Sequence, residues 1–466
     1  MKRWVLTIVV LLTVTSLLQA ETPNIILCMA DDQGWGDTAY NGHPELKTPH
    51  LDAMSKAGLR FDRFYAAAPV CTPTRGSVMT GRHPNRFACF KWGHALRPQE
   101  TTIAEALKTK GYVTGHFGKW HLGSVRTGSP VNPGSSGFDH WLSAPNFYDN
   151  DPILSREGKA VQLKGESSII AADAAIEFIG KQAKASKPFL AVVWFGSPHS
   201  PHRAVAEDLA HYGNKGHWQG EITGLDRAVG KLRAALRDLK IHENTLFWYC
   251  SDNGGLKTAS SGGRGKKGSI YEGGLRVPGI IEWPARIPKA RSSALPANTS
   301  DIYPTLLAIT DVAVEKQARL DGISLLPLIN GETMIERPGG MGFWDYPAGG
   351  ISTPSAAWMA ELLKAQAAGD ESKNKSRLRL DAGKIKGNYA EDRFSGHSAW
   401  LNWPWKLHRV GGKKAGTPRI ELYDLAADPM EKQNLAAGNP DRVKTMGAEL
   451  EKWLASVARS LNGKDY

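Results

Sequence analysis

The sequence predicts an α/β fold in which helices sandwich a mostly parallel central sheet, followed by a smaller C-terminal α+β subdomain. Three continuous apolar runs are typical of strands buried on both faces: Asn24–Ala30, residues 189–196 and Thr245–Ser251. Segments with helical spacing, such as residues 222–239, lie between these runs, and this alternation indicates a parallel sheet covered by helices. Beyond about Arg337 this alternation of strand-like and helix-like segments gives way to a different pattern, which indicates a separate unit.

Signals at the ends of segments predict the first helices. Residues 49–58 follow Thr48, a candidate cap, and open with a proline, which suits the first helical position. Residues 102–110 open with Thr102 and Glu105, which have the spacing of a capping box. We therefore expect a short helix in each segment.

The sequence of the C-terminal part indicates both helices and strands. Residues 356–386 are rich in alanine, lysine and charge, which indicates an exposed helix or an insertion. Residues 400–410 and 419–423 read as short strands, and residues 439–459 as a closing helix. These elements together predict the α+β subdomain.

Residues 1–20 read as a secretory signal peptide. Lys2 and Arg3 precede an apolar run, and Ala20 offers a small residue at a plausible cleavage point. A membrane-tethering helix is the alternative. No later stretch is long and apolar enough to span a bilayer. We therefore expect an exported protein without a membrane span after cleavage, periplasmic or extracellular, or lysosomal or secretory in a eukaryote.

Composition narrows the class of protein. A hydrophobic content of 41% excludes a disordered chain, and four cysteines in 466 residues are too few for a disulfide scaffold. The net charge of +12 would attract anionic substrates, although it can equally serve solubility. For an exported protein we expect anionic glycans rather than nucleic acid as partners.

Acidic residues follow two of the predicted strands directly. Asp31 and Asp32 come after the first apolar run, and Asp252 and Asn253 come after the third. Ligand sites in open α/β sheets form beyond the carboxyl ends of the strands. Hard cations such as Ca²⁺ and Mg²⁺ prefer such oxygen ligands, whereas either pair alone could be an ordinary turn. The coincidence of both pairs favours a metal site.

A cysteine stands at a predicted helix start. Pro73 fits the first turn of a helix, which would leave Cys71 at its N-terminus, where the helix dipole lowers the pKa of a thiol. Arg75, one turn on, suits an oxyanion. The alternative is a buried structural cysteine, the role expected for Cys28 and Cys250 inside apolar strands.

Cationic and imidazole side chains lie in polar, Gly-rich turns. They are Lys119, His121, His199, His202 and Lys267. Such groups could hold a tetrahedral anion and protonate a leaving oxygen, although each alone could belong to a solvated loop.

Six short blocks of residues follow one another between about residues 23 and 435. They are DDQGWG at 31–36, CTPTR at 71–75 with TGR at 80–82, GKWHLG at 118–123, SDNG at 251–254, KGSIYEGG at 267–274 and LYDL at 422–425. In this combination the chain resembles the formylglycine-dependent sulfatases of the alkaline-phosphatase superfamily. Position 74 is Thr where many members have Ser or Ala, which leaves the Cys-Pro-Arg core intact.

The resemblance implies an alkaline-phosphatase-like fold and the hydrolysis of sulfate esters. It implies that a formylglycine-generating enzyme converts Cys71 to an aldehyde, whose hydrate attacks sulfur with one hydroxyl and expels sulfate with the other. Residue 71 would bind Ca²⁺, or Mg²⁺, together with Asp31, Asp32, Asp252 and Asn253.

The resemblance also implies roles for the cations and imidazoles. Arg75, Lys119 and Lys267 would steady residue 71 and the sulfate oxygens. His121 would assist the hydrate, and His199 would contact the sulfate and protonate the leaving alcohol. His202 would line the substrate pocket.

Residues 21–336 would form the catalytic domain and residues 337–466 the C-terminal subdomain. The substrate would be a sulfated carbohydrate or an aryl sulfate. Two alternatives stay open, namely a phosphodiester or phosphonate ester hydrolase of the same superfamily, and a glycan-binding pseudoenzyme with an unmodified cysteine.

Overall fold

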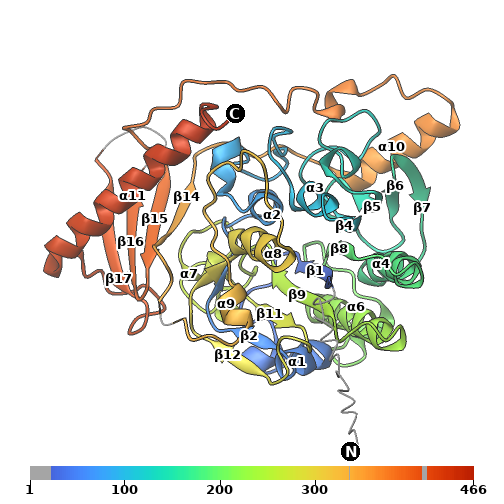
Figure 1. Cartoon of the computed structure of the whole chain (residues 1–466), viewed down its shortest axis with the longest axis horizontal. Helices are drawn as coiled ribbons and strands as arrows, with labels where there is room; N and C mark the ends of the chain where they lie inside the picture. The colour runs from blue at the N-terminus through green and yellow to red at the C-terminus, as the bar shows by residue number, and fades with distance from the viewer. Residues whose placement is uncertain (1–21, 335, 412–416) are drawn as a thin grey trace, which may run out of the picture.

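The protein is built around a mixed sheet with helices on both faces (Figure 1). The computed structural model describes residues 22–334, 336–411 and 417–466, so the predicted signal peptide lies outside the described residues. In the described part the sheet has ten strands, in the order β12 (Arg291–Ser293), β2 (Leu59–Phe61), β11 (Gly279–Glu282), β9 (Thr245–Ser251), β1 (Asn24–Ala30), β8 (Phe189–Trp194), β4 (Val113–Lys119), β5 (His140–Ala144), β6 (Ile153–Arg156) and β7 (Lys159–Gln162). The run from β9 to β5 is parallel, which confirms the predicted fold class.

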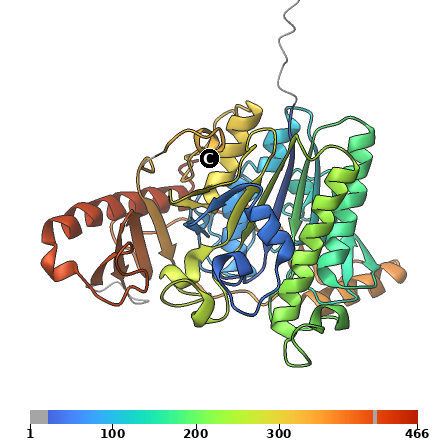
Figure 2. The same ribbon diagram turned by 90° about the horizontal axis from the view of Figure 1, so that it is seen from below.

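The apolar runs form strands because both faces of the sheet are covered. Ile25 and Leu27 of β1 belong to one core, whereas Ile26 and Cys28 belong to the other. The first core is completed by α2 (Cys71–Thr80), α3 (Ile103–Lys108) and α8 (Ile302–Thr310), and the second by α1 (Pro49–Ser55), α4 (Ser167–Lys184) and α6 (His217–Asp238). Figure 2 shows α4 and α6 side by side on one face. A strand without a solvated face needs no alternation of polar and apolar residues.

Helix ends follow the predicted signals only in part. Thr102 and Glu105 form the predicted capping box of α3. Thr48 occupies the N-cap position of α1 and Pro49 follows it, as predicted, although the Thr48 hydroxyl makes no capping bond and donates to Asp52 Oδ1 instead (3.0 Å). The helix ends at Ser55, before the predicted end at residue 58. Helix α6 begins five residues before the predicted start. Among the described helices, none is long and apolar enough to cross a membrane.

The C-terminal part forms its own antiparallel sheet beside the large one (Figure 1). Its strands are β14 (Met341–Asp345), β15 (His397–Asn402), β16 (Trp405–Val410) and β17 (Arg419–Asp424), and α11 (Pro440–Leu461) packs against them. The prediction of one strand over residues 400–410 is wrong, because a turn at Trp403-Pro404 divides it into β15 and β16. The division between the two domains at residue 336 stays a prediction.

The segment between β14 and β15 returns to the large sheet. Its helix α10 (Ser355–Ala367) packs on β6 and β7, at the end of the sheet far from β14 (Figure 1). Met359 and Leu362 of this helix are buried, so the predicted exposed insertion is amphipathic and covers apolar surface. This return brings part of the C-terminal half of the chain onto the large sheet.

A buried ion pair joins the C-terminal sheet to the large domain. Lys406 donates to Glu272 Oε1 (2.9 Å) and lies 3.5 Å from Glu431 Oε1, and all three side chains are buried. We expect Lys406→Met to lower the free energy of unfolding by about 3–5 kcal/mol, because two buried carboxylates lose their counter-ion. Urea unfolding would measure it, with Lys181→Met as control, since the exposed pair of Lys181 with Glu177 contributes about 0.5 kcal/mol or less. Equal effects would contradict a structural role for the buried pair.

A buried histidine makes the same interface sensitive to acid. His83 Nδ1 accepts from the Asn85 N–H, and its ring packs edge-on against Trp453 of α11. Burial lowers the pKa of His83 from 6.5 to about 3. Between these values the unfolded chain binds a proton that the folded chain does not, so stability falls as pH falls, by about 2 kcal/mol at pH 5. We expect His83→Asn, which keeps a capping acceptor, to reduce the loss of stability between pH 7 and pH 5 in urea unfolding; an unchanged loss would contradict this.

Candidate active site

The carboxyl ends of β1 and β9 place two pairs of polar residues side by side. These strands are parallel neighbours with Ala30 opposite Ser251, so Asp31 and Asp252 leave the sheet at the same edge. The backbone N–H of Asp32 donates to Asp252 Oδ1 (3.1 Å). The parallel register therefore brings residues 220 positions apart into direct contact.

A left-handed residue lets neighbouring carboxylates converge. Successive side chains of a strand point to opposite faces, but Asp32 has φ +68°, a conformation that side chains with a Cβ rarely adopt. In this position Asp32 Oδ1 accepts from Asn253 Nδ2 (2.8 Å). The side chains of both pairs thus form one buried nest, which we call the acidic nest: Asp31, Asp32, Asp252 and Asn253.

Cys71 lies against the acidic nest. It is the first residue of α2, as Pro73 predicts, and it is buried. Its Sγ lies within 4.8 Å of carboxylate oxygens of both Asp31 and Asp252. One turn later, Arg75 Nη1 donates to the carbonyl of Lys119 (2.9 Å), which holds the guanidinium beneath the nest.

Each carboxylate of the nest holds one cation. The N···O distances are 2.6–2.7 Å in the three pairs Asp252 with Arg75, Asp31 with Lys119, and Asp32 with Lys267. Burial would raise the pKa of Asp31, but Lys119, His199 and Arg75 outweigh it and hold that pKa below the ordinary value. Three buried carboxylates are therefore compensated by three cations, of which Arg75 and Lys119 are buried and Lys267 is partly exposed.

A loop from the other side of the nest supplies Lys267. Its backbone N–H donates to the carbonyl of Gly255 (3.1 Å), which lies just after the nest residues that follow β9. The next residue, Gly268, donates to the Pro69 carbonyl (2.8 Å), two residues before Cys71. These bonds fasten the loop to both neighbouring segments and aim Lys267 at the nest.

Two oxygens of the nest without a hydrogen-bond partner in the described chain indicate a cation site. Asp31 Oδ1 and Asn253 Oδ1 are buried and accept no hydrogen bond from any described residue. Buried oxygens without a donor are costly, and a cation would satisfy both. The ligand atoms of Asp31 and Asp252 approach Cys71, and those of Asp31 and Asp32 approach His199, closely enough to share an ion. The nest is therefore an Asp-rich candidate metal site, and its oxygen ligands suit a hard divalent cation.

The expected low pKa of the Cys71 thiol is wrong. Burial raises this pKa above its ordinary value, and the attraction of Lys119 and Lys267 does not offset it. The neighbouring carboxylates Asp252 and Asp31 add to the rise, because a thiolate beside them is repelled. As an unmodified residue, Cys71 is therefore a poor nucleophile.

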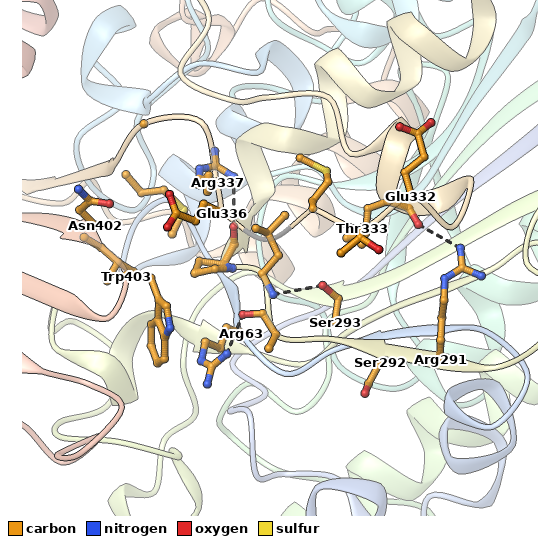
Figure 3. Close-up of a pocket in the computed structure, with 18 of the residues that line it drawn as sticks. Arg63, Arg291, Ser292, Ser293, Glu332, Thr333, Glu336, Arg337, Asn402 and Trp403 are labelled. Carbon is orange, nitrogen blue, oxygen red and sulfur yellow. Dashed lines mark hydrogen bonds between the residues drawn. The ribbon is translucent and has the colours of Figure 1, made fainter.

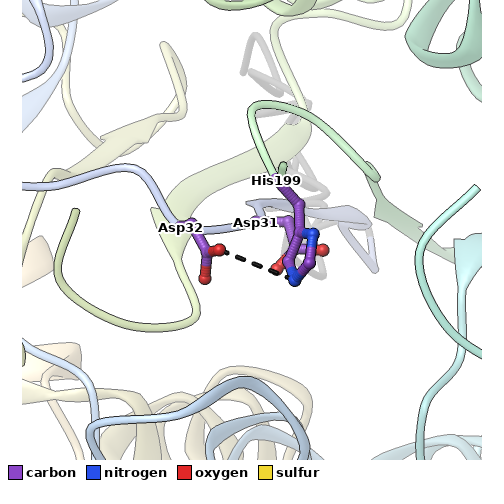
Figure 4. A group of neighbouring side chains, drawn as sticks. All are labelled: Asp31, Asp32 and His199. Carbon is purple, nitrogen blue, oxygen red and sulfur yellow. Dashed lines mark ion pairs between the residues drawn. The ribbon is translucent and has the colours of Figure 1, made fainter. Parts of the chain in front are cut away.

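His199 faces the nest from the loop after β8. Its Nε2 lies 3.7 Å from Asp32 Oδ2, and Figure 4 shows the ring beside Asp31 and Asp32. Its Nδ1 lies 2.5 Å from the Ser200 carbonyl, and the ring of Phe147 stacks on it. These contacts fix the ring with one edge toward the carboxylates.

The other two imidazoles behave differently. His121 has φ +55°, and both of its buried ring nitrogens are without a hydrogen-bond partner in the described chain. Burial, with the neighbouring cations Lys119 and Arg75, lowers its pKa well below 6.5, so the ring is neutral. His202 contacts the Pro198 carbonyl through Nε2 (3.0 Å).

Several residues of the site line a hollow of about 580 Å³, which we call the catalytic hollow. Cys71, His121, His199 and Lys267 line it, and His202 does not. The sequence analysis missed other residues that line it: Trp92, Asn146 and Thr353. The sequence around them carries no motif. An exposed tryptophan can indicate a binding surface, but the exposure of Trp92, 46%, is known only from the structure.

The other described cysteines lie in the core. Cys28 and Cys250 are buried inside β1 and β9, as expected. Cys89, for which the sequence made no prediction, is also buried, and burial raises its pKa.

A second cavity, of about 600 Å³, lies between the large domain and the C-terminal sheet (Figure 3). Arg337 in its wall pairs with Asp301 (2.7 Å), and Arg63 lies over the ring of Trp403 (3.7 Å). None of the site residues predicted from the sequence lines this cavity. Its cations are engaged in the fold, so the catalytic hollow is the candidate active site.

Comparisons with known proteins agree with this geometry. A family model described as Sulfatase matches residues 23–312, more than half of the chain. N-acetylgalactosamine-6-sulfatase of Canis lupus familiaris is 32% identical over 358 residues, which cover 68% of this chain and 68% of that protein. Arylsulfatase A of Homo sapiens is 30% identical over 460 residues, which cover 90% of this chain and 84% of that protein.

A solved structure shares the architecture. The crystal structure of Ps i-CgsB in complex with k-i-k-neocarrahexaose matches with a TM-score of 0.75 and 25% identity, and the match covers 93% of each chain. Together with the family match, this similarity confirms the alkaline-phosphatase-like fold. The chain belongs to the sulfatase family and is a sulfuric ester hydrolase.

Proposed function

We propose that this sulfatase hydrolyses sulfate esters on a carbohydrate, with formylglycine at position 71 and Ca²⁺ in the acidic nest. Sulfatases generally use a formylglycine and a divalent metal. One observation carries the proposal for this chain, namely that Cys71 Sγ lies within 4.8 Å of carboxylate oxygens of Asp31 and Asp252. A nucleophile at this position would be held next to a cation and near the positive charges of Lys119 and Lys267.

The cation would be held by Asp31, Asp32, Asp252, Asn253 and residue 71. Oxygen ligands favour Ca²⁺, and Mg²⁺ is the alternative. When both groups are present, the formylglycine hydrate supplies one hydroxyl to attack sulfur and a second to release sulfate, and the cation lowers the pKa of the attacking hydroxyl.

The charges of the site match an anionic reaction. Because three cations already compensate the three carboxylates, a divalent cation would leave the site with a surplus of two positive charges. A sulfate monoester and a deprotonated hydroxyl carry one negative charge each. Lys119 and Lys267 would bind sulfate oxygens, and Arg75 would keep Asp252 in place.

The histidines would move the protons. The contact of His199 Nδ1 with the Ser200 carbonyl requires a proton on Nδ1, so a second proton on Nε2 makes the ring an imidazolium, the form of a general acid. His199 would donate this proton from Nε2 to the leaving alcohol. His121 is neutral and its ring nitrogens are free, so it would accept a proton from a hydroxyl at residue 71. A substrate contact of His202 stays a prediction.

A carbohydrate substrate fits the catalytic hollow. Trp92 presents an exposed aromatic face at the rim, and such faces pack on sugar rings. The relatives include a sulfatase named for N-acetylgalactosamine and a structure in complex with k-i-k-neocarrahexaose. We further propose that a formylglycine-generating enzyme modifies Cys71 and that residues 1–20 direct export.

A mass spectrum of the peptide that contains residue 71 would test the proposal, on protein made together with a formylglycine-generating enzyme. We expect an aldehyde at position 71, bound Ca²⁺ in metal analysis, and faster hydrolysis of nitrophenyl sulfate than of nitrophenyl phosphate. A free thiol, found while a control sulfatase is converted in the same cells, would contradict the aldehyde. Faster hydrolysis of the phosphate ester would contradict the sulfate preference.

A further inference from the structure

Another hollow, of about 880 Å³, lies next to the catalytic hollow, and we call it the outer hollow. The two share His121, Ser352 and Thr353 in their walls. A substrate whose sulfate ester lies at residue 71 can therefore extend into the outer hollow.

The segment 374–381 forms one wall of the outer hollow and carries three cations. Two of them differ sharply in their partners. Arg377 pairs with Glu361 (2.6 Å) and lies over the ring of Trp358, so its charge is neutralised. Arg379 has no carboxylate within ion-pair distance among the described residues, and its one hydrogen bond there goes to the Gly93 carbonyl (2.9 Å). Its other N–H groups are therefore available to a ligand.

Lys375 is the third cation of this wall. It is exposed, and it makes no side-chain hydrogen bond or ion pair with any described residue. Asp381 also lines the outer hollow and carries the opposite charge. Two unpaired cations against one carboxylate leave this wall with a positive surplus.

Hydrogen bonds place Arg379 close to the catalytic residue. Gly93 accepts from Arg379 through its carbonyl, and its N–H donates to Thr72 Oγ1 (3.0 Å). Thr72 directly follows Cys71, so a single residue, Gly93, connects Arg379 to the start of α2. Arg126 fixes the beginning of the segment, because its guanidinium donates to three backbone carbonyls there, those of Glu371, Lys373 and Asn374.

Arg379 follows the short 3-10 helix Lys375–Leu378 and ends it. Its φ is +56°, and a left-handed residue is common at such a helix end. Its guanidinium, which pairs with no described carboxylate, lines the outer hollow.

We propose that the substrate carries a second anionic group, a sulfate or a carboxylate, and that Arg379, with Lys375, binds it in the outer hollow. This inference rests on the proposed function and deepens it: the substrate is a polyanionic glycan and not a sugar with a single sulfate. The planar guanidinium of Arg379 suits both oxyanions because it can donate two parallel hydrogen bonds. Trp358 also lines the outer hollow, beside Arg377, and adds an aromatic side chain that could contact the sugar between the two groups.

Matched substrates would test this subsite. We would compare kcat/KM for a sugar with one sulfate ester, for the same sugar with a second sulfate, and for a sulfated disaccharide with a uronate carboxylate. We expect the aldehyde-bearing wild type to prefer at least one doubly anionic substrate by about tenfold or more. The sulfate and carboxylate arms identify which anion the subsite takes.

Variants assign the preference to residues. We expect Arg379→Gln to reduce the preference about tenfold and Lys375→Gln to reduce it less, mainly through KM, because the contact exists equally in the ground state and the transition state. Arg393→Gln is the matched control, since Arg393 is exposed, pairs only with Asp392 among the described residues and lines neither hollow. An unchanged preference in Arg379→Gln, or an equal loss in the control, would overturn the proposal. Should Arg379→Gln fail to fold, Lys375→Gln decides, because Lys375 is exposed and its side chain makes no hydrogen bond or ion pair within the described part of the chain.

The outcomes separate this inference from the proposed function. A wild type that cleaves nitrophenyl sulfate but shows no preference for a second anion would refute the subsite alone. A wild type that releases sulfate from no substrate would refute the proposed function. In that case the dissociation constant of the disulfated sugar, measured for the wild type and Arg379→Gln, would still test the subsite, and equal constants would refute it.

Discussion

Replacement of Cys71 by alanine is expected to lower kcat/KM for nitrophenyl sulfate by about 1,000-fold or more. Residue 71 is buried against the acidic nest, whose carboxylates pair with three cations, and alanine can supply no hydroxyl there. Cys71→Ser is expected to show no steady-state turnover either, because one hydroxyl can attack sulfur but leaves none to expel sulfate. Initial rates on protein from cells that contain a formylglycine-generating enzyme would measure both effects.

Cys28→Ala is the matched control for this experiment. Cys28 is equally buried, but it lies inside β1 and faces the core. Its replacement should cost some stability while kcat/KM stays within about twofold of the wild type. A Cys71→Ala variant that keeps wild-type activity would refute residue 71 as the nucleophile.

Removal of the cation is expected to have the second largest effect. Chelation should lower kcat/KM by about 100-fold or more, and added Ca²⁺ should restore it. Without the cation the three ion pairs of the nest leave no surplus of positive charge, so the anionic ester loses its main attraction. The same ion should stabilise the folded chain by about 3 kcal/mol at a hundredfold excess over its Kd, because Asp31 Oδ1 and Asn253 Oδ1 then gain a partner.

Asp31→Asn separates binding of the cation from general damage. This variant keeps the size of the side chain but removes its charge, so we expect low activity and no rise of the unfolding midpoint with Ca²⁺. Asp226→Asn is the control, since Asp226 is also buried but accepts from the backbone N–H groups of His50 and Leu51 and is not part of the nest. Its midpoint should rise with Ca²⁺ as in the wild type. A chelated wild type with full activity would contradict the metal site.

Local patterns in the sequence were sufficient for the central fold. The apolar runs of β1 and β9 have the predicted bounds, because a strand covered on both faces needs only continuous apolar residues. The capping box at Thr102 was readable for the same reason, since its two partners lie three residues apart. The turn inside residues 400–410 was not readable by periodicity alone, because apolar residues continue on both sides of it.

The candidate site was likewise predicted from the sequence only in part. The motif blocks named Cys71, Asp31 and Asp252 as one set, and the parallel register of β1 and β9 explains why they meet. The pKa of Cys71 was predicted in the wrong direction because the helix terminus is visible in the sequence, whereas burial is a property of the folded chain.

The sequence by itself therefore determined the α/β architecture, the sulfatase family and the residues of the acidic nest, since periodicity and short motifs carry this information locally. Only the tertiary structure decided how the site is walled. Trp92 and Asn146 line the catalytic hollow, and Arg379 lines the outer hollow. All three come from segments without a motif, and contacts between distant loops, such as the bond from Arg379 to the Gly93 carbonyl, hold them there. Such contacts depend on the packing of the whole chain, because a loop residue acquires its neighbours only when the elements on either side of it are in place.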